Sequence, residues 1–232
     1  MLHVPTQCIN LLSGYLTGRQ QVVMVNGKSS APSAVTSGVP QGSVLGPTMF
    51  IALMHDINDS VSSGTFLSLF ADDILVFRPQ THDGDVAVFQ ADLDSISQWG
   101  NVNQLSFNPS KSAHIRLSRK RNPGQAEYFL DGARIPSVSS AKYLGLHIDQ
   151  KFNWTTHWAV KCAAARKRMR YLNALFKYRN SAARIKLFEA LVQPLFDYCP
   201  SVTWSFLFGT VRKIEHCSRK FLRSVRLGVS SR

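Results

Sequence analysis

The spacing of hydrophobic residues in the first part of the chain changes between a helical and a strand-like pattern. An amphipathic helix is predicted by apolar residues three and four positions apart, at Val86, Phe89, Leu93 and Ile96. Two shorter helices are expected, one over 6–18 and one that begins near Pro47, because proline is well accommodated in a first helical turn.

Strands are predicted between these helices. An Asn-Gly or Asp-Gly pair beside an apolar run is a strong hairpin signal, and such pairs occur at Asn26-Gly27 and Asp131-Gly132. Single strands are expected over 112–117 and 141–149. Together these elements predict an α+β domain over residues 1–150, with antiparallel strands and helices on one side.

Residues 151–232 carry a helical pattern throughout. The first predicted helix has apolar positions that step by four and three, at Trp158, Cys162, Ala165, Met169, Leu172 and Phe176. A second predicted helix runs from Ser181 to about Pro194. A third begins near Val211 and has Ile214, Phe221 and Val225 on its inner side. This region is therefore predicted to be a small all-helical domain.

The segment FLSLFADDILVF, residues 66–77, places two adjacent aspartates between two short apolar runs. The runs predict a tight, mostly buried hairpin with Asp72 and Asp73 at its tip. An Asp-Asp pair by itself is also compatible with a solvated turn. Carboxylates held rigidly on an apolar hairpin instead favour a hard cation such as Mg²⁺, which commonly combines one or two carboxylates with substrate phosphates.

A loop rich in glycine and proline, SGVPQGSVLGP over residues 37–47, precedes the helix near Pro47. Its glycines allow the backbone to approach a ligand closely. The Gln41 side chain offers a donor and an acceptor, which suit a base edge or a sugar. A plain connecting loop is the alternative interpretation.

Charge is concentrated in the helical region. The chain has 27 Lys and Arg against 14 Asp and Glu, a net charge of +13. Residues 1–150 hold 10 basic and 11 acidic residues, whereas residues 151–232 hold 17 basic and 3 acidic ones. A region this basic needs an anionic partner, for which nucleic acid is favoured and a membrane surface is the second candidate. The candidate contacts on the first helix of this region are Arg166, Lys167, Arg168 and Arg170.

Other features exclude several classes of protein. No run of 18 or more apolar residues occurs, so no transmembrane helix is expected, and the first residues lack the features of a signal peptide. The four cysteines have no zinc-binding spacing and are expected to be reduced thiols. We therefore expect an intracellular protein.

Four motifs in order resemble the reverse transcriptases of non-LTR (LINE-like) retrotransposons. They are SGVPQGSVLGP, LFADDILVF, LSFNPSKSAHI and AKYLGLHID, and the similarity extends over nearly the whole chain. The resemblance implies a partial polymerase palm over 1–150, followed by a helical thumb over 151–232. It also implies two-metal nucleotidyl transfer onto a primer 3′-hydroxyl, as an RNA-directed DNA polymerase. The implied partners are an RNA template, a DNA primer, their RNA–DNA hybrid and deoxynucleotides, and the implied location is the nucleus.

The resemblance also implies a role for each matching position. Asp72 would be a direct ligand of the catalytic Mg²⁺ ions, with Asp73 as its partner in the motif. Lys111 would protonate the leaving pyrophosphate, although a surface lysine is the alternative. The pocket for the incoming nucleotide and the templating base would be lined by Pro40, Gln41 and Gly42. The primer grip, or alternatively an ordinary strand, would be formed by Tyr143, Leu144 and Gly145.

One part of the family pattern has no match. The family's first catalytic motif carries another aspartate before the segment that HVPTQCINLLSGYL matches, and no aspartate precedes Asp56 in this sequence. We therefore expect the chain to bind Mg²⁺ weakly and not to polymerise alone. The alternative, from another class, is a non-catalytic nucleic-acid-binding relic or domesticated protein.

Overall fold

A computed structural model describes residues 4–82, 84–121, 124, 126–176 and 181–203, together with residues 212, 215, 216, 218, 219, 221, 223 and 225. The chain forms two compact units, Met1–Phe107 and Asn108–Arg232, which are described separately below. Helices and strands occur in both units, as expected for an α+β protein. The division into palm and thumb at residue 150 stays a prediction.

Among its described residues, the first unit contains three α-helices and three antiparallel strand pairs. The predicted helices are confirmed as α1 (Thr6–Leu16), α2 (Leu45–Leu53) and α3 (Asp85–Val102). A short 3₁₀ helix (Ile57–Ser60) follows α2. The hairpin around Asn26-Gly27 is confirmed, and the strands of this part of the chain are β1 (Gln20–Gln21), β2 (Met24–Val25), β3 (Lys28–Ser29) and β4 (Ser33–Ala34).

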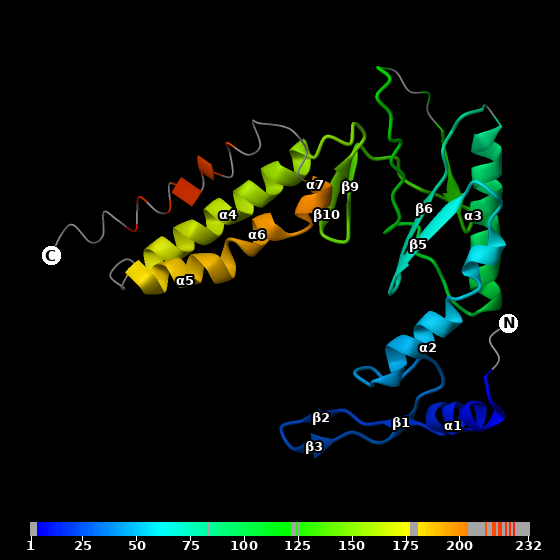
Figure 1. Cartoon of the computed structure of the whole chain (residues 1–232). Coiled ribbons are helices and arrows are strands. Elements are labelled where there is room, and N and C mark those ends of the chain that lie inside the picture. The colour runs from blue at the N-terminus through cyan, green and yellow to red at the C-terminus, as the bar shows by residue number, and fades with distance from the viewer. Residues whose placement is uncertain are drawn as a thin grey trace. The chain divides into compact units, whose positions relative to one another are not determined.

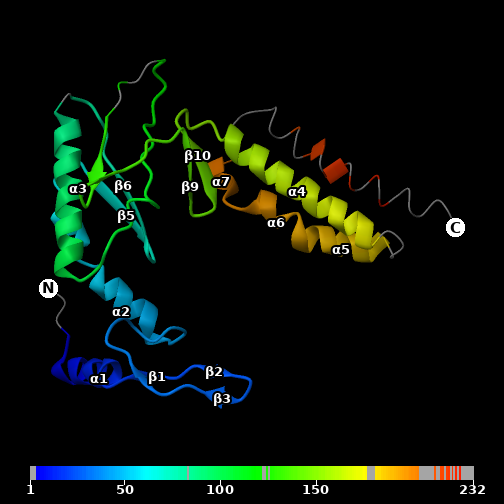
Figure 2. The same ribbon diagram turned by 180° about the vertical axis from the view of Figure 1, so that it is seen from behind.

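The core of this unit lies between α3 and the hairpin of β5 (Phe66–Phe70) and β6 (Asp73–Phe77), which run side by side in Figures 1 and 2. Met54, Ile57 and Ile96 are buried there. Alternate strand residues reach this core from the hairpin, namely Leu67, Leu69, Ile74 and Val76. Their period of two is that of a strand with one covered face.

The expectation that this hairpin is mostly buried is wrong. Only one of its faces packs on the core, and the other exposes 50% of Phe66, 62% of Phe70 and 47% of Phe77. The physical reason is that β5 and β6 form a two-stranded sheet of their own, with no further strand or helix over the outer face in the described part of this unit.

The second unit begins with two further hairpins. The one at Asp131-Gly132 is confirmed as β7 (Phe129–Leu130) and β8 (Ala133–Arg134). Two strand predictions need correction. Residues 112–117 form no strand beyond an isolated bridge between His114 and Ser137. Residues 141–149 are not one strand but the hairpin of β9 (Ser140–Tyr143) and β10 (Leu146–Asp149).

The helices of this unit are α4 (Thr155–Leu175), α5 (Ser181–Leu191), α6 (Pro194–Asp197) and α7 (Pro200–Thr203). The predicted inner stripe of α4 is confirmed, because Trp158, Cys162, Ala165, Met169 and Leu172 are all buried. Figure 1 shows α4 beside α5, whose Phe188 joins the same core. Phe221 and Val225 of the third predicted helix are buried there too, whereas Val211 and Ile214 lie outside the described residues. None of the helices within the described ranges is long and apolar enough to cross a membrane.

Candidate functional site

The two aspartates stand where the sequence places them, at the tip of the β5–β6 hairpin. Ala71 and Asp72 form the two-residue turn, and Asp73 opens β6 opposite Phe70. Ala71 has φ 51, a left-handed value that this tight turn imposes on a residue with a side chain. Both carboxylates are exposed to solvent, so the tip presents them outward.

Asp73 shares the outer face of the hairpin with exposed aromatic rings. Because strand residues alternate between faces, Asp73 lies on the same side as Phe70, Phe66 and Phe77. The rings of Phe66 and Phe77 stack with centroids 5.2 Å apart. The outer face of the hairpin therefore combines one carboxylate with an exposed aromatic strip.

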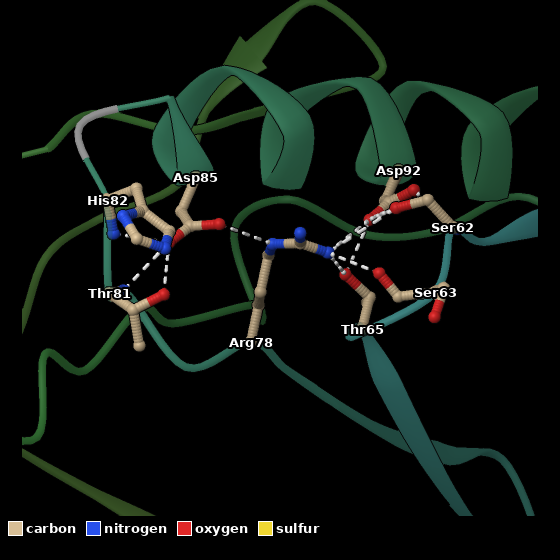
Figure 3. A network of polar contacts seen from close by, with 8 residues as sticks. All are labelled: Ser62, Ser63, Thr65, Arg78, Thr81, His82, Asp85 and Asp92. Atoms are coloured by element: carbon tan, nitrogen blue, oxygen red, sulfur yellow. Dashed lines mark hydrogen bonds and ion pairs between the residues drawn. The ribbon is translucent and has the colours of Figure 1, made fainter.

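A polar network ties the base of this hairpin to α3 (Figure 3). Arg78, directly after β6, donates from Nε to Asp85 Oδ1 at 3.3 Å, and its Nη1 lies 4.0 Å from Asp92 Oδ2. The same Nη1 donates to the Ser63 carbonyl at 3.0 Å and to Thr65 Oγ1 at 3.1 Å, just before β5. One guanidinium thereby joins both ends of the hairpin to the helix.

Asp92 forms the buried end of this network. Its side chain accepts hydrogen bonds from the Ser62 backbone N–H at 2.8 Å, the Ser62 hydroxyl at 2.9 Å and the Thr65 hydroxyl at 2.5 Å. Burial by itself would raise the pKa of Asp92, but these hydrogen bonds and the charge of Arg78 outweigh it and lower the pKa. Asp92 is therefore an ionised hub.

Asp85 forms the other end and is the first residue of α3. It accepts hydrogen bonds from the backbone N–H groups of His82 and Thr81, both at 2.7 Å. These bonds, together with the Arg78 side chain, lower the pKa of Asp85 to about 2. Asp85 and Asp92 lie seven residues apart on the helix face that also carries Phe89 and Ile96. Two acids on the inward face are a sequence signal that could have pointed to this network, although it identifies none of their partners.

The donor set at the hairpin tip fits a magnesium ion in part. Magnesium takes oxygen ligands and is often held by one or two carboxylates plus the phosphates of a substrate. Asp72 and Asp73 supply that minimum. Within the ranges that the structure describes, His, Cys, Asp and Glu side chains form no group of three or more that could hold a metal ion. Among these residues, no third carboxylate therefore joins Asp72 and Asp73 at the tip.

The Pro40–Gly42 segment forms a tight bend before α2. Gly42 has φ 78, and the Ser43 N–H donates to the Pro40 carbonyl at 3.3 Å. A Cβ added at Gly46 would lie 2.9 Å from Ser43 Oγ and 3.3 Å from the Pro40 carbonyl, so the bend packs directly on the helix start. Gln41 is exposed at this bend.

Lys111 belongs to the second unit, whereas the aspartate pair belongs to the first. It lies in a turn that Asn108 builds, since the Asn108 carbonyl accepts from the Lys111 N–H at 3.1 Å and the Asn108 side chain accepts from the Ser110 N–H at 3.0 Å. The Lys111 side chain is exposed. Its role toward pyrophosphate stays a prediction.

Tyr143, Leu144 and Gly145 form the end of β9 and the turn into β10, not the middle of a strand. Leu144 has φ 44 and Gly145 has φ 80, which makes a two-residue hairpin turn of the kind that usually carries Asn-Gly. The predicted contact residues therefore stand at a half-buried hairpin turn.

The four predicted basic contacts are all exposed on α4 but do not share one face. At about 100° per residue, Arg166 and Arg170 lie on one side of the helix and Arg168 lies about 200° around from Arg166. Arg168 instead shares its side with Lys161, seven residues earlier, and donates from Nη1 to the Leu191 carbonyl. Sequence reasoning treated these charges as one set, whereas the helix separates them.

Comparison with known proteins agrees with the motif pattern. Residues 2–148 match the family model described as reverse transcriptase (RNA-dependent DNA polymerase). The chain is 31% identical over 158 residues to the probable RNA-directed DNA polymerase from transposon X-element of Drosophila melanogaster, which covers 66% of this chain and 17% of that protein. No solved structure matches the present chain.

Two relatives match over almost the whole chain. The RNA-directed DNA polymerase from mobile element jockey of Drosophila funebris is 26% identical over 94% of this chain and 25% of its own length. The jockey protein of Drosophila melanogaster is 24% identical over 95% of this chain and 25% of its own length. The chain thus spans about a quarter of the length of these two relatives.

Proposed function

Because this chain belongs to the reverse transcriptase family, in the branch carried by non-LTR retrotransposons, we propose that it is part of an RNA-directed DNA polymerase. The observation that supports this most directly is the exposed pair Asp72 and Asp73 on a hairpin whose base Arg78 fixes to α3. In the proposed reaction the primer 3′-hydroxyl attacks the α-phosphate of a deoxynucleotide, and pyrophosphate leaves.

Asp72 and Asp73 are the residues that would hold Mg²⁺. When bound, the ions stabilise the charge on the attacking oxygen and on the leaving phosphate. Because the described residues offer the tip only two carboxylates, we propose that these 232 residues bind Mg²⁺ weakly and do not polymerise by themselves. A rigid hairpin base keeps the two like charges at a fixed place, where substrate phosphates can complete the coordination.

The remaining predicted contacts divide by the part of the substrate they would meet. Lys111 would donate a proton to pyrophosphate. The Pro40–Gly42 bend would face the nucleotide and the templating base, with the exposed Gln41 amide able to bond an edge or a sugar. The turn over Tyr143, Leu144 and Gly145 would hold the primer end.

The basic helices after residue 150 would act as a thumb that contacts the phosphates of an RNA–DNA hybrid without reading sequence. Chromosomal DNA as the final target would place this activity in the nucleus.

A localised-cleavage experiment tests the metal site. With Fe²⁺ in place of Mg²⁺, ascorbate and peroxide generate hydroxyl radicals that cut the backbone beside the bound ion. We expect cleavage near residues 70–74, lost in the Asp72→Asn/Asp73→Asn variant and retained in Asp94→Asn, which removes an exposed aspartate of α3. Unchanged cleavage in the double variant would remove the metal site from the proposal.

A second candidate function is nucleic-acid binding without catalysis. It is favoured by the observation that only two carboxylates stand at the tip among the described residues. Binding of a labelled RNA–DNA hybrid with no localised iron cleavage would support it. Primer extension by the purified chain, abolished by Asp72→Asn, would instead rule it out and show that no further carboxylate is needed.

A further inference from the structure

The β9–β10 turn needs support from outside its own hairpin. Both of its residues have positive φ, at Leu144 (φ 44) and Gly145 (φ 80). Glycine adopts such a conformation freely, but leucine rarely does, since its Cβ crowds the backbone there. A turn with leucine at this position is held only where neighbouring groups fix it.

Tyr198 supplies that support from a distant part of the chain. Its hydroxyl donates a hydrogen bond to the Leu144 carbonyl at 2.6 Å, across 54 residues of sequence. Its ring covers the other turn residue, because a Cβ added at Gly145 would lie 3.2 Å from Tyr198 Cε1. The two contacts hold the backbone of both turn residues, one by a hydrogen bond and one by packing.

Tyr198 is itself 42% exposed, and the buried residue nearest to it in sequence belongs to α6. Tyr198 follows this helix, whose Phe196 is only 6% exposed in the core of the second unit, and α6 in turn packs against α4 and α5. A single aromatic side chain therefore links the turn to the helix pair α4 and α5, which together carry seven of the chain's 27 Lys and Arg residues.

The cation beside the tyrosine indicates what the turn faces. Lys161 Nζ lies 5.1 Å from the centroid of the Tyr198 ring. Within the described ranges, no carboxylate oxygen lies within 4.0 Å of Lys161 Nζ. Burial, and then the nearby charges of Lys142 and Arg168, lower the pKa of Lys161. A cation that has no carboxylate partner among the described residues favours an anion such as a backbone phosphate.

We propose that Tyr198 is a positioning residue for the primer grip, which shapes the Leu144–Gly145 turn so that it can hold the 3′ end of a primer. This inference rests on the proposed function for the turn itself. Tyr198 acts through the Leu144 carbonyl and the Gly145 backbone, and Lys161 on its ring sets the charge beside them.

Photocrosslinking from the primer tests this role on the full chain. A 4-thiothymidine is placed at the 3′ end of a DNA primer annealed to RNA, and crosslinked peptides are mapped by mass spectrometry. Tyr198→Phe keeps the ring and removes only the hydroxyl. We expect crosslinks to residues 140–149 to fall about 2- to 10-fold, the change expected when one ordinary hydrogen bond is lost.

The affinity for the hybrid should change less than about twofold in Tyr198→Phe, because phosphate contacts dominate affinity. Tyr171→Phe on α4 is the matched control, since that side chain is 67% exposed and stands near the other end of α4 from His157, and it should leave crosslinking unchanged. Amide exchange over residues 143–147, measured without nucleic acid, should be faster in Tyr198→Phe.

The outcomes separate the two levels of the proposal. Equal crosslinking in the wild type and Tyr198→Phe, with hybrid bound, overturns the positioning role and leaves the proposed function intact. A wild-type chain that binds the hybrid but never crosslinks at 140–149 overturns the primer-grip assignment itself. Unchanged amide exchange in Tyr198→Phe overturns the claim that the hydroxyl holds the turn, whatever the nucleic acid does.

Discussion

At the scale of single residues, Asp92 is the most consequential polar group in the first unit. Its side chain lies in a buried position, at 4% exposure, and receives three hydrogen bonds from Ser62 and Thr65. A buried carboxylate that is fully bonded stabilises its surroundings, whereas removal of one partner leaves the others unsatisfied. Any change at this position therefore acts on the base of the hairpin that carries Asp72 and Asp73.

Asp92→Asn should destabilise the first unit by about 2–3 kcal/mol, because the amide turns an acceptor into a donor and leaves the Arg78 charge less well compensated. Amide exchange within α3 should become about 30- to 150-fold faster, as 1.4 kcal/mol corresponds to a factor of ten. Asp94→Asn, an exposed change two residues later, is the control and should alter exchange little. Equal effects of the two substitutions would contradict the hub role.

At the scale of elements, close contact with the segment that follows α3 explains why the helix has a glycine at position 100, where helix propensity alone would favour alanine. A Cβ at Gly100 of α3 would lie 2.6 Å from Phe107 Cε2 and 2.9 Å from the Leu105 carbonyl. Gly100→Ala should therefore destabilise α3 by about 1–3 kcal/mol despite alanine's better helix propensity. Gly14→Ala, in α1 with no atom within 4 Å, should instead stabilise its helix by up to about 1 kcal/mol. Amide exchange of the two helices checks both, and slower exchange in α3 after Gly100→Ala would contradict the packing argument.

The elements also show how far the sequence alone could lead. Local signals were enough for the hairpins at Asn26-Gly27 and Asp131-Gly132, for the inner stripe of α4, and for the tip that carries the aspartates. The β9–β10 hairpin was missed because its turn contains Leu144, which is no turn signal and depends on Tyr198. The Arg78 network was missed because its partners are brought together only by folding.

At the scale of the whole molecule, the uneven charge predicts where nucleic acid binds. Each phosphate contact contributes about 0.9 to the slope of log affinity against log salt concentration. The Arg166→Gln/Arg170→Gln variant, which changes two exposed side chains on one side of α4, should lower that slope by up to about 2 for an RNA–DNA hybrid. Lys28→Gln with Arg119→Gln removes the same charge elsewhere and should leave the slope nearly unchanged. An equal loss in both variants would indicate attraction by net charge alone.

The two units should also respond to acid in different ranges. His157 is fully buried, and its Nδ1 accepts a hydrogen bond from the His147 N–H at 3.2 Å. Burial, followed by the charges of Lys161 and His147, lowers its pKa from 6.5 to about 4. The unfolded chain therefore takes up a proton first, and the second unit should lose stability as the pH falls from about 6.5 to 4.

In the first unit the pKa values of Asp85 and Asp92 are both lowered, and that of Asp85 falls from 3.8 to about 2. The contribution of Asp85 is present above pH 4 and is lost between about pH 4 and 2. Amide exchange, corrected for intrinsic rates, should therefore show α4 losing protection at higher pH than α3. His157→Gln, whose side-chain oxygen can still accept from the His147 N–H, should weaken the dependence of α4 protection on pH. Asp85→Asn should do the same for α3. Loss of protection in both helices over one common range would show that these two groups do not set the acid response.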